Sequence, residues 1–209
     1  QCTGCRGIPG SRITFYCSRN CQEAHWEVHK KTCWSLIVRK RFYRAAQLLK
    51  DAWLVYRRIS YDVLVERVEI VKNDILVTEG DMQLARKQRG GRMTFSFLDS
   101  SVENEEVKKA ILCDIMCMDA VAYMHETIKS VLSGLVSQAP NPFAELDLEV
   151  KNQTWNVRHI KPSGLHDPTQ YDHHVLRIKV KNGEDYILGL TSAQYGWHDD
   201  AFPYQEYMD

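Results

Sequence analysis

This sequence has no excess of charge of either sign and no long apolar run. Its 27 basic residues balance 27 acidic ones, so no global electrostatic attraction draws the chain to nucleic acid or to an anionic membrane. No stretch reaches the roughly 18 consecutive apolar residues that a membrane-spanning helix needs, and no secretory signal is visible. We therefore expect an intracellular protein of the cytoplasm or nucleus, with neither nucleic acid nor a membrane as its main partner.

The cysteines are odd in number and uneven in position, which argues against a disulfide framework. Five of the seven lie within the first 33 residues, interleaved with histidines, whereas Cys113 and Cys117 lie far downstream. In a reducing compartment, thiols and imidazoles crowded in this way indicate zinc coordination. The candidate zinc ligands of this segment are Cys2, Cys5, Cys17, Cys21, His25, His29 and Cys33.

Spacing limits which of these residues can share one metal. Cys2 and Cys5 form a C-x2-C knuckle, whose tight turn lets both sulfurs reach one zinc ion. The segment from Asn20 to Cys33 has Asn at its head and neither Gly nor Pro, so we expect a helix that begins there. Between Cys21 and Cys33 such a helix rises about 18 Å. One zinc ion cannot hold both ends, because two ligands of one zinc lie only about 3 to 4 Å apart.

The natural partition therefore divides the ligands between two sites. The first is a complete tetrahedral zinc site, and the second is half a site. The ligands of the complete site are Cys2, Cys5, His29 and Cys33, and those of the half site are Cys17 and Cys21. His25 is the nearby candidate for a substitute ligand of the half site, but we expect it to be an exposed helix residue beside Trp26.

The run FYCSRNCQEAHWEVHKKTC, from Phe15 to Cys33, resembles the second half of a MYND zinc finger. The resemblance covers residues 1–33 and implies two zinc ions in a cross-braced order, with the first and third ligand pairs on one metal and the second and fourth on the other. On this resemblance the second pair is Cys2 and Cys5, the third is Cys17 and Cys21, and the fourth is His29 and Cys33. The first pair is missing, and because the sequence begins at Gln1 rather than Met, we expect it to be a fragment.

The resemblance to MYND fingers also implies a function. These modules dock other proteins and take short proline-rich motifs. Carried over to this sequence, Gln22 would bond a peptide backbone through its amide, and Trp26 would stack on proline through its indole ring. We therefore expect a zinc-dependent protein-protein interaction module whose partner carries a proline-rich motif.

The rest of the chain predicts an α+β domain after the finger. Residues 34–137 are mainly helical, with a β-hairpin that turns at Lys72–Asp74 and one long helix predicted from Glu103 to Leu135. Residues 138–209 are rich in strands, with a hairpin whose positive φ angles we assign to Asn182 and Gly183. We expect both regions to form one domain.

Two enzymatic alternatives follow from the same region. A papain-like or transglutaminase-like hydrolase, active or decayed, would use a cysteine at the start of a helix and a histidine on a strand, for which His173 or His174 is the candidate. Two features of the sequence argue against this hydrolase. The position where it would need an acidic residue is Gly189, and we expect Cys113 and Cys117 in the middle of the long helix.

A lysine methyltransferase is the second alternative, because one such family carries a MYND finger, but the asparagine-histidine-serine motif of that family is absent from this sequence. The segment YILGLTSAQYGW, from Tyr186 to Trp197, resembles one in uncharacterised MYND-type proteins of filamentous fungi. We expect no enzymatic activity.

Overall fold

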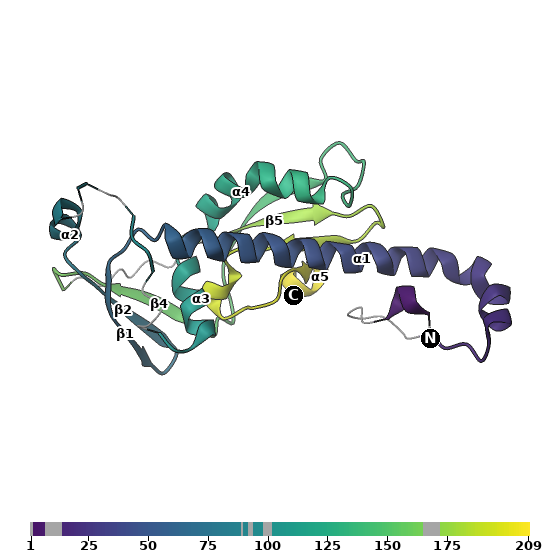
Figure 1. The fold of residues 1–209 in the computed structure, drawn as a ribbon, viewed down its shortest axis with the longest axis horizontal. Coiled ribbons are helices and arrows are strands. Elements are labelled where there is room, and N and C mark those ends of the chain that lie inside the picture. Colours follow the sequence, from purple (N-terminus) through teal and green to yellow (C-terminus); the bar gives the residue numbers. More distant parts are fainter. Residues whose placement is uncertain (1, 7–13, 89, 92–93, 98–101, 165–171) are drawn as a thin grey trace.

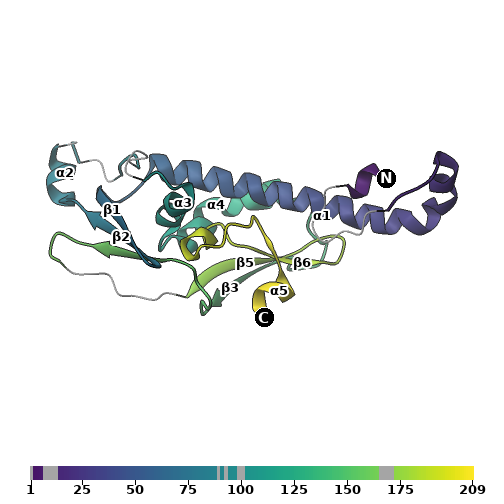
Figure 2. The same cartoon turned by 90° about the horizontal axis from the view of Figure 1, so that it is seen from below.

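One helix runs along most of the length of the molecule in the computed structural model (Figures 1 and 2). The structure describes residues 2–6, 14–88, 90–91, 94–97, 102–164 and 172–209. The helix, α1 (Arg19–Ile59), has 41 residues and is therefore about 60 Å long at 1.5 Å per residue. It contains neither Gly nor Pro, so no residue within it breaks its hydrogen-bond ladder.

The cap of α1 lies two residues before the predicted one. The side chain of Ser18, not of Asn20, caps the helix, because its Oγ accepts a hydrogen bond from the backbone amide of Cys21 at 3.2 Å. Asn20 is already inside the first turn. The predicted helix through Cys33 is confirmed, but it does not stop there.

A buried stripe on α1 forms one side of the main core. Phe42, Ala46, Leu49 and Trp53 recur at steps of four, three and four residues, and all four are fully buried. The ring of Phe42 packs on that of Tyr186 in the second sheet, with centroids 4.7 Å apart. The core thus joins the N-terminal helix to strands more than a hundred residues later.

The first sheet has three strands in the order β1-β2-β4. β1 (Val65–Val71) and β2 (Asp74–Glu79) form the predicted hairpin, in which Lys72 takes a positive φ of 58°. β4 (Asn156–Ile160) pairs in parallel with β2. A short helix, α2 (Met82–Gln88), follows this hairpin in sequence.

The second sheet is antiparallel, with the order β3-β5-β6-β7. Its strands are β3 (Phe143–Leu148), β5 (His173–Lys179), β6 (Asp185–Leu188) and β7 (Phe202–Pro203). The predicted hairpin between β5 and β6 is confirmed, but of Asn182 and Gly183 only the glycine has a positive φ, at 89°. The amides of Val180 and Gly183 donate to the carbonyls of Glu184 and Val180, so the loop has three residues, with its left-handed glycine last.

The long helix predicted from Glu103 to Leu135 is wrong as a single element. It is two helices, α3 (Glu105–Cys113) and α4 (Cys117–Leu132). At the break Ile115 has a φ of 57°, and its amide donates to Oε1 of Gln194 at 3.1 Å. Gln194 lies in the 3-10 helix η3 (Ser192–Tyr195), so a contact across the fold overrides the local helical pattern.

The fold is α+β, as predicted, and most of the buried apolar residues that the structure describes belong to two clusters. The larger takes residues from both 34–137 and 138–209, and the short C-terminal helix α5 (Tyr204–Met208) ends the chain beside it. The smaller consists of Cys2, Cys5, Cys33 and Leu36. No helix among the described residues is long and apolar enough to cross a membrane.

A polar clamp fastens the turn between β5 and β6 to α1. The side-chain amide of Asn182 donates to both the carbonyl and the Oγ of Ser35, each at 3.2 Å. Two residues along, Glu184 accepts hydrogen bonds from Arg39, at 3.1 Å from its Nε, and from the Tyr186 hydroxyl at 2.6 Å. Burial by itself raises the pKa of the Glu184 carboxyl, but these hydrogen bonds outweigh burial and lower it.

We predict that Glu184→Gln lowers the free energy of unfolding at pH 7 by about 1–2 kcal/mol, because Arg39 loses its charged partner. The pKa of Glu184 is lower in the folded chain than its unfolded value of about 4.5. The clamp therefore contributes fully above pH 4.5 and is lost as the pH falls through the folded pKa. Denaturant unfolding of both proteins from about pH 3 to pH 7 measures this.

Glu69→Gln is the matched control, because Glu69 pairs with Arg67 on β1 and both side chains are largely exposed. It should change stability by less than about 0.5 kcal/mol at any pH. A difference between wild type and Glu184→Gln that does not depend on pH would contradict the proposed charge interaction.

Candidate metal centre

A short 3-10 helix, η1 (Thr3–Cys5), positions the first two thiols of the cluster. The amide of Cys5 donates to the carbonyl of Cys2 at 3.3 Å, which closes the knuckle, and the Cys2 amide donates to the carbonyl of Thr14 at 3.1 Å. Gly4 lies against α1, where a Cβ atom would come within 2.7 Å of Cys33 Sγ. The knuckle therefore needs glycine at this position to approach the helix so closely.

His29 and Cys33 face the knuckle from one side of α1, because four residues turn a helix by about 400°. Cys2 Sγ lies 3.7 Å from Cys33 Sγ, and Cys5 Sγ lies 3.3 Å from His29 Nε2. All four donor atoms lie within 4.8 Å of one another, and all four side chains are buried. Tetrahedral zinc with Zn–S bonds of about 2.3 Å places its sulfurs about 3.8 Å apart, so these spacings suit a closed zinc site.

The protonation of the thiols explains why this cluster suits a cation. Burial, together with the neighbouring thiols, raises the pKa of Cys5 to about 12. At Cys2 burial also acts to raise the pKa, but hydrogen bonds from His29 and Cys33 outweigh it and lower the pKa to about 7. Three buried thiols in contact cannot all ionise unaided, and a divalent cation supplies the missing positive charge. Three sulfurs and one imidazole nitrogen are a donor set that fits zinc.

Aromatic rings surround the imidazole of His29. The ring of Tyr16 meets it edge-on at 6.0 Å between centroids, and the indole of Trp26 lies 6.3 Å away. The Tyr16 hydroxyl also shares a hydrogen bond of 3.0 Å with Nδ1 of His25. These ring contacts contribute to the burial of His29.

The predicted half site lies apart from this cluster. Cys17 and Cys21 are exposed, and their sulfurs are 2.8 Å apart at the start of α1. Within the part of the chain that the structure describes, no third histidine, cysteine or carboxylate joins them in a metal-binding group. His25, the candidate substitute, is exposed and directs Nδ1 to Tyr16 instead.

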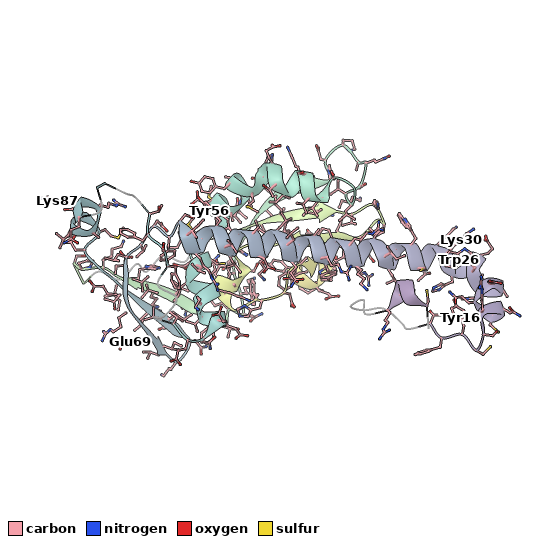
Figure 3. The ribbon with its side chains drawn as sticks, in the orientation of Figure 1. Tyr16, Trp26, Lys30, Tyr56, Glu69 and Lys87 are labelled. Atoms are coloured by element: carbon pink, nitrogen blue, oxygen red, sulfur yellow. The ribbon has the colours of Figure 1, made fainter. Side chains whose placement is uncertain are left out.

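The two predicted peptide contacts lie one turn apart on α1, near the metal cluster. Gln22 is half-buried, and Trp26 remains 43% exposed although its ring approaches His29. Figure 3 shows Trp26 and Lys30 on the N-terminal part of α1, at the end of the molecule opposite to Lys87. Gln22 and Trp26 are thus one helical turn apart, and the side chain of Trp26 is open to solvent.

Of the residues of the predicted hydrolase alternative, Cys113, Cys117 and His173 are buried, whereas His174 is partly exposed. Cys113 ends α3 and Cys117 begins α4, so neither is in the middle of a helix as predicted. Burial raises the pKa of Cys113 to about 12. Burial also lowers the pKa of His173 to about 4, and its Nε2 shares a hydrogen bond of 3.1 Å with Ser192 Oγ.

The position of the expected acid is occupied by other atoms. A Cβ atom at Gly189 would lie 2.0 Å from Ser192 Oγ, so the fold leaves no room for a side chain there. His174 does meet carboxylates, those of Asp147 and Glu145, but both are on exposed parts of β3. Among the described residues, no hydrogen bond joins Cys113 or Cys117 to either histidine.

Sequence reasoning missed two residues of the cluster's surroundings. Gly4 was not singled out, although a glycine inside a C-x2-C turn that must pack on a helix is a usable signal. Tyr16 was not assigned a role either, because its contacts with His25 and His29 depend on the chain folding back onto α1. No spacing rule reports such a contact.

Comparison with known families agrees with this geometry. The sequence model of the MYND finger family matches residues 1–33, the segment that holds all four ligands of the cluster. The chain matches no curated protein and no solved structure.

We predict one tightly bound zinc ion per chain, and we expect Cys33→Ser to lose it and to unfold the finger. The reason is that the binding free energy of a structural zinc ion is largely folding free energy. Mass spectrometry of the metal content and amide NMR signals of residues 14–33 measure both effects. Cys21→Ser is the control, because this exposed thiol lies outside the four-ligand cluster. A finger that stays folded after both chelation and Cys33→Ser would rule the prediction out.

Proposed function

Because residues 1–33 form a MYND finger, a zinc-binding module for protein-protein interaction, we propose that this chain docks short proline-rich peptides on the first turns of α1. The observation that carries the proposal is the exposed indole of Trp26, one helical turn from Gln22 and beside the buried metal cluster. An aromatic face and a nearby amide are the two groups that an extended proline-rich segment needs.

Each side chain has a distinct role in this proposal. The indole of Trp26 offers a flat apolar face on which a proline ring stacks, and burial of that face drives binding. A polyproline II segment has no internal hydrogen bonds, so its backbone carbonyls are free to accept one from the amide of Gln22. The low conformational entropy of such a segment reduces the cost of binding.

The role of zinc here is structural. Cys2, Cys5, His29 and Cys33 would together supply the four donors of a closed, structural zinc site. Zinc joins the knuckle of Cys2 and Cys5 to the helix at His29 and Cys33, and the stretch between them carries Gln22 and Trp26. Binding of the peptide therefore depends on zinc through the fold of the finger.

We predict that a proline-rich peptide binds the zinc-loaded chain and that Trp26→Ala weakens binding at least about fivefold, as truncation of a stacking aromatic residue does at interfaces. Gln22→Ala should weaken it less, because one hydrogen bond is lost. Titration followed by amide NMR shifts measures both affinities.

Val28→Ala is the control for this titration. Val28 is 72% exposed on the same helix, but it points away from Trp26, because two residues turn a helix by about 200°. It should bind as the wild type does. Equal affinity of Trp26→Ala and wild type, or no binding of any proline-rich peptide to the folded finger, would refute the proposal.

We infer that the larger part of the chain is a scaffold for the finger and that Cys113 is not the nucleophile of a hydrolase. The Cys113 thiol is fully buried, and its raised pKa keeps it protonated and a poor nucleophile.

We predict that iodoacetamide labels the exposed Cys17 and Cys21 of the metal-free chain well before Cys113, as mass spectrometry of the modified peptides would show. Fast labelling of Cys113, or a hydrolytic activity lost in Cys113→Ala, would contradict this inference.

A further inference from the structure

The second sheet ends at β3, which is an edge strand. β3 pairs with β5 on one side, and among the described residues no strand pairs with its other side (Figure 2). An open edge presents backbone amides and carbonyls to which another extended chain can add. The larger domain therefore has a candidate interaction surface of its own, outside the finger.

The register of the sheet shows which backbone groups of β3 face outward. The amide of Lys179 donates to the carbonyl of Pro142 at 2.8 Å. Because hydrogen-bonded pairs alternate along an antiparallel ladder, the next residues bonded to β5 are Ala144 and Leu146. The residues that alternate with them direct their amides and carbonyls away from β5. These outward residues are Phe143, Glu145 and Asp147.

Two of the outward residues carry carboxylates. The side chains of Glu145 and Asp147 are 57% and 67% exposed. Both carboxylates meet the imidazole of His174 on β5, at 3.2 Å from Nε2 for Glu145 and 2.6 Å from Nδ1 for Asp147. Opposite charges directly across a strand pair are stabilising. A strand that adds at this edge is therefore favoured by basic side chains opposite the two acids.

The same charges disfavour pairing of β3 with a second copy of itself. A two-fold arrangement centred on Leu146 would place Glu145 directly opposite Asp147. One centred on Glu145 would place that residue opposite its own copy. Because like charges directly opposite each other destabilise a strand pair, the edge suits a basic segment of another protein and not a copy of the same strand.

A cavity of about 650 Å³ adjoins this edge. Its walls come from α4 and from the second sheet. The residues that line it include His125, Ile128 and Lys129 on α4, and Phe143, Glu145 and Leu176 on the sheet. Ile128 and Leu176 are buried, so the cavity has an apolar floor. The amine of Lys129 pairs with Glu126 on the same helix at 3.9 Å.

The cavity lies on the face of the sheet to which the outward residues direct their side chains. Phe143, Glu145 and Asp147 are two residues apart from one another, so their side chains share this face. A residue of an added strand that lies opposite Phe143 would therefore direct its side chain to the cavity. An apolar side chain suits that position because of the apolar floor.

We propose that the edge of β3 binds an extended segment of another protein in which basic residues alternate with apolar ones. The added strand runs antiparallel to β3, as neighbouring strands do throughout this sheet. Two basic side chains lie opposite Asp147 and Glu145, and an apolar side chain two residues further along enters the cavity beside Phe143. This site is separate from the proposed peptide docking on α1, and it gives the larger domain a binding role beyond that of a scaffold.

The test uses a fluorescein-labelled peptide that contains the run Lys-Val-Lys-Val-Leu and a matched peptide with Glu in place of both lysines. Fluorescence anisotropy with the zinc-loaded full chain gives both affinities. We expect the lysine peptide to bind at least about tenfold more tightly at low salt, because two opposite-charge pairs replace two like-charge pairs. This preference should shrink as salt rises.

Methylation of the peptide backbone separates strand addition from simple charge attraction. The second lysine lies opposite Glu145 and donates its amide to β3, so methylation of that nitrogen should weaken binding about tenfold. The amide of the second valine points away from β3. Methylation there is the matched control and should weaken binding much less.

The double variant Glu145→Gln, Asp147→Asn keeps the size of both side chains and removes their charge. It should bind the lysine and glutamate peptides about equally. Glu69→Gln is the control, because Glu69 is a largely exposed acid on β1, the edge strand of the first sheet. Glu69→Gln and Trp26→Ala should both keep the preference of the wild type for lysine, because neither residue lies at this edge.

Zinc content and circular dichroism confirm that each variant is folded. Equal binding of the lysine and glutamate peptides to wild type, or equal effects of the two methylations, overturns the proposal. A preference for lysine that persists in Glu145→Gln, Asp147→Asn also overturns it, because the peptide would then bind elsewhere. None of these outcomes bears on the docking of proline-rich peptides at Trp26, which its own titration tests.

Discussion

The unbroken length of α1 is the constraint on which both the finger and the larger core depend. Its N-terminal part carries His29 and Cys33, which complete the metal cluster, and its later turns carry Phe42 and Trp53, which are fully buried in the main core. Because no Gly or Pro interrupts the helix, the two regions share one stiff element. The orientation of the finger is therefore set by the packing of the same helix on the second sheet.

The finger and the core are stabilised by different kinds of interaction. The core is held by apolar burial across α1, α3, α4 and the second sheet. The finger has only the small cluster around Cys2, Cys5, Cys33 and Leu36, which buries too little apolar surface to fold a module by itself. The binding free energy of zinc supplies the folding free energy that apolar burial does not provide in the finger. The hydrogen bonds from Asn182 to Ser35 then join the part of α1 that follows the last metal ligand to the turn between β5 and β6.

Local patterns in the sequence were sufficient to predict the parts of the molecule that depend on neighbours in the chain. The i, i+4 spacing of His29 and Cys33, with the knuckle, predicted the cluster that the structure brings together. Alternation and turn residues predicted both hairpins. The assignment of Cys17 and Cys21 to a second metal site, and of Gln22 and Trp26 to peptide binding, stays a prediction.

Contacts between distant segments could not be predicted in the same way. The apolar pattern from Glu103 to Leu135 fits one helix throughout, but at the break the backbone amide of Ile115 donates a hydrogen bond to Oε1 of Gln194. The turn between β5 and β6 is fastened to α1 through Asn182, which donates a hydrogen bond to Ser35 across 147 residues of sequence. Such pairings depend on the tertiary fold, which periodicity does not report.

X-ray absorption at the zinc edge of the purified chain tests the central claim most directly. A site made of Cys2, Cys5, His29 and Cys33 predicts three sulfur neighbours at about 2.3 Å and one nitrogen at about 2.0 Å. A first shell of four sulfurs, or one dominated by oxygen and nitrogen, would contradict the assignment of these four ligands.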